Sequence, residues 1–260
     1  MRRRHNFGGI LWTLAVAAVA ALLIALIVET RILVIARIDV YGAGDAVAEV
    51  TRMSGIRLGQ RLRTVDEDQV RSAVESDGRF AFVGLEKDYP NIVRLAVRYR
   101  TEDAMISQGG KILVLDSDAY VISVSDNLPQ KSLPYVTGLR PSGYILGRQL
   151  DTGDGRCAAM KTVLEAVRTN NAWRYVSELN VADPDKMTIT SRTGIIVQLG
   201  DQRNMNNKIL WMVGALADLE SRGEVTGQLD VSSGIMADYR PAAAPSQPET
   251  GAGIGQGFGS

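Results

Sequence analysis

The longest apolar stretch of the chain lies close to its N-terminus, at residues 10–28. It contains no charged side chain, and Thr13 carries its single hydroxyl group. A helix of this length rises about 28 Å, which is close to the thickness of the hydrocarbon core of a bilayer. A helix in a soluble core usually keeps one polar face, which this stretch lacks. The pattern therefore predicts a membrane-spanning helix at residues 10–28.

The charges on either side of this stretch predict its orientation. Arg2, Arg3 and Arg4 precede it, whereas Glu29 and Arg31 follow it and cancel. Because positive charge stays on the cytoplasmic side, we expect residues 1–9 to form a cytoplasmic tail and the bulk of the chain to be extracytoplasmic. The alternative is a cleaved signal peptide, with or without a twin-arginine motif. Such a peptide has a shorter apolar region and a small-x-small cleavage site, which the exit from this stretch does not offer.

Two kinds of apolar spacing follow the predicted anchor. Alternation with period two predicts strands, and spacing at three and four residues predicts helices. The strands are expected at residues 34–41, 82–89 and 92–100, and the helices at residues 46–56 and 64–77. Thr64 and Glu67 have the form of a capping box at the start of the second helix. Residues 33–101 thus predict a unit with the order β-α-α-β-β.

One face of the last strand in this unit is basic. Arg94, Arg98 and Arg100 alternate with apolar residues between positions 92 and 100. Strict alternation with charge on one side is typical of a sheet that is half exposed to water, so we expect this row to be solvated. Contact of the row with lipid head groups or with an acidic partner is the alternative.

The second part of the chain, residues 102–240, mixes strands and helices. Gln108-Gly109-Gly110-Lys111 predicts a hairpin turn between two short apolar strands. Helices are expected at residues 154–169 and 204–221. Further strands are expected at residues 119–124, 133–138, 179–181, 186–190, 194–200, 228–231 and 234–239. The fold class is therefore α+β, a mixed arrangement that ends in an exposed C-terminal edge strand. Residues 241–260 have little to bury and are expected to be a disordered tail.

Composition excludes several classes of function. The 29 basic residues balance the 29 acidic ones, and without Arg2, Arg3 and Arg4 the remainder is mildly acidic, which argues against a nucleic-acid partner. Cys157 is the single cysteine, so the chain can form no internal disulfide; its place on the inner face of a helix predicts a core residue. His5, the single histidine, lies beside the predicted anchor. Histidine-dependent hydrolase and zinc sites are thereby excluded from the extracytoplasmic part, and no cofactor or metal is expected.

Carboxylate chemistry survives this exclusion and has one candidate motif. Asp151-Thr152-Gly153 matches the tripeptide of aspartic proteases. Such a site needs two carboxylates that share a proton, and the chain has no second copy of the tripeptide. A polar turn before a helix is the simpler interpretation, and the stretch lacks the positions of a calcium loop. A membrane-anchored extracytoplasmic hydrolase that uses Asp151 remains the alternative function.

Several short motifs together resemble one known family. They are Ile38-Asp39-Val40-Tyr41-Gly42, the Gly-Gly hairpin with Leu115-Asp116, Leu133-Pro134 leading to Gly138, and Gly227-Gln228-Leu229-Asp230-Val231. With the basic tail and the single N-terminal span, they are similar to the FtsQ/DivIB family of bacterial cell-division proteins over roughly residues 10–240. The resemblance implies a POTRA domain at residues 33–101, a β domain at residues 102–240 and a role without enzymatic activity.

The resemblance also implies partners and a place in the cell. Members of this family bind the bitopic proteins FtsB and FtsL, and that complex controls the septal peptidoglycan synthase FtsW–FtsI. The chain is therefore expected in the bacterial plasma (inner) membrane, at the division septum.

A partner-binding segment follows from the same resemblance. It maps onto Ser233-Gly234-Ile235-Met236-Ala237-Asp238-Tyr239. An exposed last strand offers unpaired N–H and C=O groups, to which a partner can add a strand. Alternation would place Ile235, Ala237 and Tyr239 on one face, with Tyr239 as the expected anchor of the partner. The alternative is that the strand is paired on both sides inside the sheet.

Overall fold

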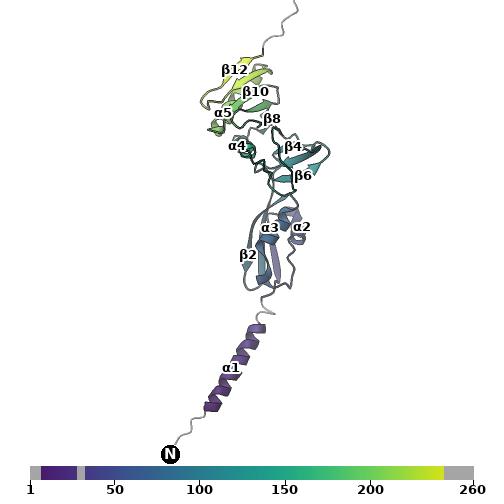
Figure 1. Cartoon of the computed structure of the whole chain (residues 1–260), viewed down its shortest axis with the longest axis vertical. Coiled ribbons are helices and arrows are strands. Elements are labelled where there is room, and N and C mark those ends of the chain that lie inside the picture. Colours follow the sequence, from purple (N-terminus) through teal and green to yellow (C-terminus); the bar gives the residue numbers. More distant parts are fainter. Residues whose placement is uncertain (1–6, 28–32, 243–260) are drawn as a thin grey trace, which may run out of the picture.

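The computed structural model describes residues 7–27 and 33–242. Helix α1 (Phe7–Ile27) comes first (Figure 1). Its side chains at residues 12–26 are exposed. None of the helices in the described part of the chain combines the length and the apolarity needed to cross a bilayer. The span expected at residues 10–28 stays a prediction, and its last residue lies outside the described residues. So do most of the expected cytoplasmic tail and nearly all of the expected C-terminal tail.

The first folded unit has the predicted order of elements. Its sheet has the order β1-β3-β2, with β1 parallel and β2 antiparallel to β3. The helices α2 and α3 lie between β1 and β2 in the sequence, so the prediction of β-α-α-β-β is confirmed. The elements are β1 (Arg37–Tyr41), α2 (Val47–Met53), α3 (Glu67–Glu75), β2 (Phe80–Asp88) and β3 (Ile92–Tyr99), with 3-10 turns at Gly44–Ala46 and Leu62–Thr64.

A separate apolar core holds this unit together. Val93, Leu95 and Val97 alternate along β3 and are buried, as the period of two requires. They pack with Val70 and Val74 from α3 in one cluster of buried residues. The helices thus cover one face of the three-stranded sheet, and the other face carries charged side chains such as Arg94 and its partners Glu86 and Asp88.

The start of α3 differs from the sequence prediction. Asp66, and not Thr64, is the N-cap: its Oδ1 accepts hydrogen bonds from the backbone N–H groups of Asp68 (2.9 Å) and Gln69 (3.2 Å). Thr64 belongs to a 3-10 turn, where its hydroxyl donates to the carbonyl of Arg61 (2.8 Å). The expected capping box was wrong because two good N-cap residues stand two positions apart.

Replacing Asp66 by alanine is therefore expected to lower the free energy of unfolding by about 1 kcal/mol, since two amide groups of α3 lose their acceptor. Thr64→Ala is the matched control and should cost clearly less. Urea unfolding of both variants measures the difference. Equal losses, or a larger loss for Thr64→Ala, would restore the capping box predicted from the sequence.

The second folded unit is built on a nine-stranded sheet. Its order is β12-β11-β10-β9-β8-β7-β4-β5-β6. The strands are β4 (Ala104–Gln108), β5 (Lys111–Leu115), β6 (Val121–Ser125), β7 (Tyr135–Thr137), β8 (Val176–Asn180), β9 (Met187–Ser191), β10 (Ile196–Gly200), β11 (Gly227–Asp230) and β12 (Asp238–Pro241). The hairpin predicted around Gly109-Gly110 is confirmed as the antiparallel pair β4–β5.

Two helices connect parallel neighbours of this sheet. Helix α4 (Arg156–Thr169) joins β7 to β8, and helix α5 (Met205–Ser221) joins β10 to β11. The two helices contact each other, and their apolar faces share one buried cluster with the sheet. Cys157 lies in this cluster as a free thiol, and burial raises its pKa. Its predicted role as a core residue is confirmed.

Candidate functional site

The C-terminal strand of the nine-stranded sheet lies at an edge. Within the described residues β12 pairs only with β11, in an antiparallel register that places Tyr239 opposite Leu229. A strand with a neighbour on one side keeps a row of N–H and C=O groups free on the other side. Pro241, which has no N–H group, ends the strand, and proline in a sheet is typical of such an edge.

The strand is shorter at its start than the sequence predicted. Only Asp238 and Tyr239 of the segment from Ser233 to Tyr239 lie in β12, which continues to Pro241. Residues 231–237 form the connection from β11. Gly234 has a φ of +71° there, and its N–H donates to the carbonyl of Val231 (3.0 Å). The apolar alternation from 234 to 239 therefore does not correspond to one strand, because a turn occupies its first half.

The side chains of this segment have different environments. Ile235 and Met236 are 73% and 57% exposed, beside the start of β12. Ala237 and Tyr239 are partly buried against the core of the second unit. The expectation that Ile235 shares a face with Tyr239 was wrong, because Ile235 lies in the turn and points into solvent.

Tyr239 holds the edge strand on the sheet. Its hydroxyl donates to the carbonyl of Thr226 (2.5 Å) and lies 3.3 Å from Oε2 of Glu224. Burial of the hydroxyl raises the pKa of Tyr239, and the negative charge of Glu224 adds to the rise. Gly227 has a φ of +133°, and a Cβ there would lie 2.5 Å from the carbonyl oxygen of Arg240. Glycine at this position lets β12 approach closely.

A charge pair with a buried lysine lies beneath the connection to β12. Lys208 of α5 is 1% exposed, and its Nζ donates to Oδ1 (2.9 Å) and to the backbone carbonyl (2.7 Å) of Asp201. Together with Arg203, this ammonium lowers the pKa of Asp201 to about 2. The aliphatic stem of Lys208 faces Gly234, because a Cβ on Gly234 would lie 3.6 Å from its Cγ. The sequence signal for this pair is a lysine among the apolar positions of α5.

The Asp201–Lys208 pair predicts a dependence of stability on pH. The pKa of Asp201 is lower in the folded state, so its stabilising effect is present above about pH 4 and is lost as pH falls towards 2. The free energy of unfolding of Asp201→Asn should fall below that of wild type at pH 6, and the difference should shrink between pH 4 and pH 2. Urea unfolding at several pH values measures it, with Asp185→Asn as an exposed control. A difference that stays constant down to pH 2 would contradict the assignment.

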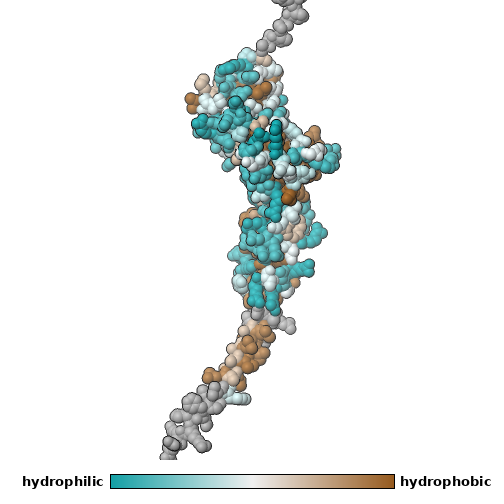
Figure 2. Space-filling model, viewed as in Figure 1, coloured by the Kyte–Doolittle hydropathy of each residue, from teal (hydrophilic) through white to brown (hydrophobic). Residues whose placement is uncertain are grey.

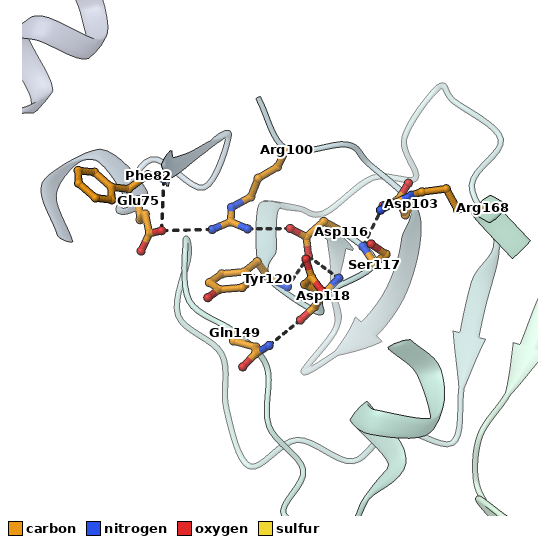
Figure 3. A network of polar contacts seen from close by, with 10 residues as sticks. All are labelled: Glu75, Phe82, Arg100, Asp103, Asp116, Ser117, Asp118, Tyr120, Gln149 and Arg168. Atoms are coloured by element: carbon orange, nitrogen blue, oxygen red, sulfur yellow. Dashed lines mark hydrogen bonds and ion pairs between the residues drawn. The ribbon is translucent and has the colours of Figure 1, made fainter. Parts of the chain in front are cut away.

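A second group of polar contacts joins the two folded units (Figure 3). Arg100 follows β3, and its side chain is 2% exposed. Its Nη1 donates to Oδ2 of Asp116 in the second unit (2.8 Å), and its Nη2 lies 3.6 Å from Oε1 of Glu75 at the end of α3. The guanidinium stacks over the ring of Tyr120 at 3.7 Å. Arg100 therefore bridges carboxylates of both units.

This bridge corrects the prediction of a solvated arginine row. Arg94 does lie at the surface, paired with Asp88 (2.7 Å), and Arg98 is exposed. Arg100 differs because β3 ends at Tyr99, so the next residue has left the face of the sheet. Its Nε has no hydrogen-bond partner within the described residues, although the two terminal nitrogens are engaged.

In the second unit, the carboxylate of Asp116 is held in place by hydrogen bonds within its own turn. Oδ1 of Asp116 accepts hydrogen bonds from the backbone N–H groups of Asp118 (3.0 Å) and Tyr120 (2.8 Å). Asp103 beside it accepts from the N–H of Ser117 (2.9 Å) and pairs with Arg168 of α4. Burial raises the pKa of Asp103 in spite of that arginine. Leu115-Asp116 stands out in the sequence as part of the family resemblance, but its contact with Arg100 is seen only in the structure.

The two units also meet through their backbones. Gly78, which follows α3, has a φ of +82°, and a Cβ there would lie 2.5 Å from the carbonyl oxygen of Ile122 in β6. A Cβ on Gly147 would lie 1.7 Å from the carbonyl oxygen of Glu75. Larger residues would force the units apart at both places.

Asp151 forms a local polar turn. Its Oδ1 accepts a hydrogen bond from the N–H of Gly153 (2.9 Å), and the residue is exposed. The hydroxyl of Thr152 donates to Asp154 (2.5 Å), which lowers the pKa of that carboxyl. The geometry agrees with the interpretation as a turn before a helix.

Comparison with known proteins gives a relative in cell division. No family model matches the chain. The chain is 20% identical over 185 residues to the cell division protein DivIB of Clostridium tetani (strain Massachusetts / E88), which covers 70% of this chain and 69% of that protein. The chain is thus similar to a DivIB cell division protein over most of its length.

A solved structure from the same group of proteins is also similar. It is the major extracytoplasmic domain of the trans isomer of DivIB from Geobacillus stearothermophilus. The identity is 14%, the TM-score is 0.33, and the match covers 47% of this chain and 95% of that domain.

Proposed function

We propose that this DivIB-like chain is a membrane-anchored assembly protein of the bacterial divisome, without enzymatic activity. In this proposal α1 belongs to an anchor at residues 10–28, the N-terminus is cytoplasmic, and the two folded units are a POTRA domain and a β domain. The similarity to a cell division protein supports the role. The apolar sequence of residues 10–28 and the exposed side chains of α1, brown in Figure 2, support the anchor.

The proposed partners are an FtsB-like and an FtsL-like bitopic protein, through which the chain would influence the septal synthase FtsW–FtsI. The observation that carries this proposal is the one-sided pairing of β12. A segment of the FtsB-like protein would add a strand to this edge, so that backbone hydrogen bonds supply affinity and side-chain contacts supply specificity.

In this proposal, the residues from Ser233 to Tyr239 have different roles. Asp238 and Tyr239 belong to the edge strand to which the partner pairs. Ile235 and Met236 are exposed apolar side chains beside it and would contact the partner. Ser233, Gly234 and Ala237 shape and hold the connection.

The proposal predicts that Ile235→Ser combined with Met236→Ser weakens binding of a soluble fragment of the FtsB-like protein by about tenfold, because two exposed apolar contacts are lost. Stability should change little, since neither side chain is buried. The matched control is Leu128→Ser, which alters an equally exposed side chain (67%) outside this segment. Titration of the full chain in detergent gives the affinities. Wild-type affinity in the double variant would remove these two residues from the interface.

A further inference from the structure

One loop of the first unit is strongly basic. Residues 54–63, which follow α2, contain Arg57, Arg61 and Arg63 and no acidic residue. Arg57 and Arg61 are exposed, and their side chains form no hydrogen bond or ion pair within the described residues. Most other arginines of this unit differ in this respect: Arg71, Arg79 and Arg94 each pair with a carboxylate.

Hydrogen bonds place this loop at the end of the unit where the chain arrives from α1. The N–H groups of Gly59 and Leu62 donate to the carbonyls of Ile35 (2.8 Å) and Leu33 (2.9 Å), and the N–H of Ile35 donates to Gln60 (2.8 Å). The neighbouring residue, Ala36, donates to the carbonyl of Asn91 in the turn between β2 and β3 (2.8 Å). The basic loop and the β2–β3 turn therefore flank residues 33–36.

Each of these two segments exposes one large side chain. Leu58, between Arg57 and Gly59, is 65% exposed, and Tyr89 before Asn91 is 62% exposed. The acidic group nearest in sequence to Tyr89 is already engaged, since Asp88 pairs with Arg94 (2.7 Å). The end of the unit thus combines unpaired positive charge, an aliphatic side chain and a tyrosine.

We propose that this end, defined by Arg57, Leu58, Arg61 and Tyr89, docks on the surface of an anionic bilayer. The proposal rests on the membrane anchor proposed above. Ile27 and Leu33 are separated by six residue steps, so the unit begins within about 20 Å of the end of α1. Arginines adsorb to anionic lipid head groups, Leu58 enters the boundary with the acyl chains, and Tyr89 lies at the head-group level.

Docking would fix how the whole extracytoplasmic part stands on the membrane. The first unit lies between α1 and the second unit (Figure 1), and the Arg100 bridge joins the two units. An orientation set at the basic loop is therefore transmitted to the β12 edge. The free arginines match the charge of an anionic lipid surface, and an acidic protein partner is the competing outcome in the test below.

The test places an environment-sensitive fluorophore at Leu58→Cys in the full chain, inserted in nanodiscs with or without anionic lipid. Val83→Cys on β2, which is 60% exposed as valine, is the matched control site. Cys157 is buried, and labelled wild type gives the background. Nitroxide lipids should quench the fluorophore at position 58 several times more strongly than at position 83, and more strongly with anionic lipid.

Charge removal completes the test. Arg57→Gln combined with Arg61→Gln should abolish most of the difference in quenching between positions 58 and 83. Each arginine near an anionic surface raises the equilibrium constant for docking by about fivefold. Arg98→Gln, an exposed arginine on β3, should leave it unchanged. Equal quenching at both sites, or a change at position 58 only when an acidic protein is added, overturns the docking. A chain that fails to co-purify with nanodiscs overturns the anchor as well.

Discussion

Replacement of Arg100 by methionine is expected to lower the free energy of unfolding by about 3–5 kcal/mol, because the buried carboxylate of Asp116 then loses its charged partner. The side chains of Arg100 and Asp116 are 2% and 4% exposed, so water cannot take over the lost contact without opening the junction. Urea unfolding monitored in both units measures the loss. The two transitions should also separate, since the ion pairs of Arg100 link one unit to the other.

Arg98→Met is the matched control for this prediction. Arg98 lies two residues earlier and is exposed, so its replacement should change stability by less than about 0.5 kcal/mol. A double variant, Arg100→Met with Asp116→Asn, should cost less than the sum of the single changes, since the pair acts as a unit. If Arg100→Met costs no more than Arg98→Met, the bridge does not join the units.

Replacement of Tyr239 by alanine is expected to weaken binding of the FtsB-like fragment at least about tenfold and to lower the melting temperature by about 5 °C. The ring packs against the core, and the hydroxyl fixes the strand to the carbonyl of Thr226 (2.5 Å). Without the ring and the hydroxyl, β12 detaches from β11. The partner then loses the strand to which it would pair, and the second unit loses stability. Fluorescence titration and thermal unfolding of the same samples measure both effects.

Tyr239→Phe separates the ring from the hydroxyl. This variant keeps the packing and loses only the contacts with Thr226 and Glu224, so binding should change by less than about threefold. If Tyr239→Ala loses binding but keeps its melting temperature, Tyr239 contacts the partner directly, as the sequence suggested. If it loses stability but keeps binding, the partner does not use β12.

Much of the fold could be predicted from local patterns. The alternation of Val93, Leu95 and Val97 identified β3, and Gly109-Gly110 identified the hairpin, because both signals depend on neighbours in the sequence. The limits of α4 and α5 were also close to prediction. The predictions that failed concern features that depend on contacts between distant residues or on competing turns. Alternation cannot show that Arg100 leaves its strand to meet Asp116, which lies sixteen positions later in the sequence.

The candidate site shows the same division. The last strand was expected at an edge of the sheet, and the sheet order agrees. Its register could not be predicted, because the turn at residues 232–235 takes up Gly234 and Ile235, which in the sequence continue the alternation up to Tyr239. Two contacts near the edge could not be predicted either. Tyr239 of β12 bonds to Thr226, the residue before β11, and Lys208 of α5 bonds to Asp201. No local sequence pattern connects the two residues of the first contact.

The central claim, that a partner adds a strand to β12, is tested most directly by hydrogen exchange of the backbone amides. The full chain in detergent is compared with and without a saturating soluble fragment of the FtsB-like protein. Amides of Asp238 to Arg240 that are free in the chain alone should exchange at least about tenfold more slowly in the complex, as inter-strand hydrogen bonds form. The edge strand β6 at the other end of the sheet should be unchanged. Saturated binding with unchanged exchange throughout β12 would contradict the account.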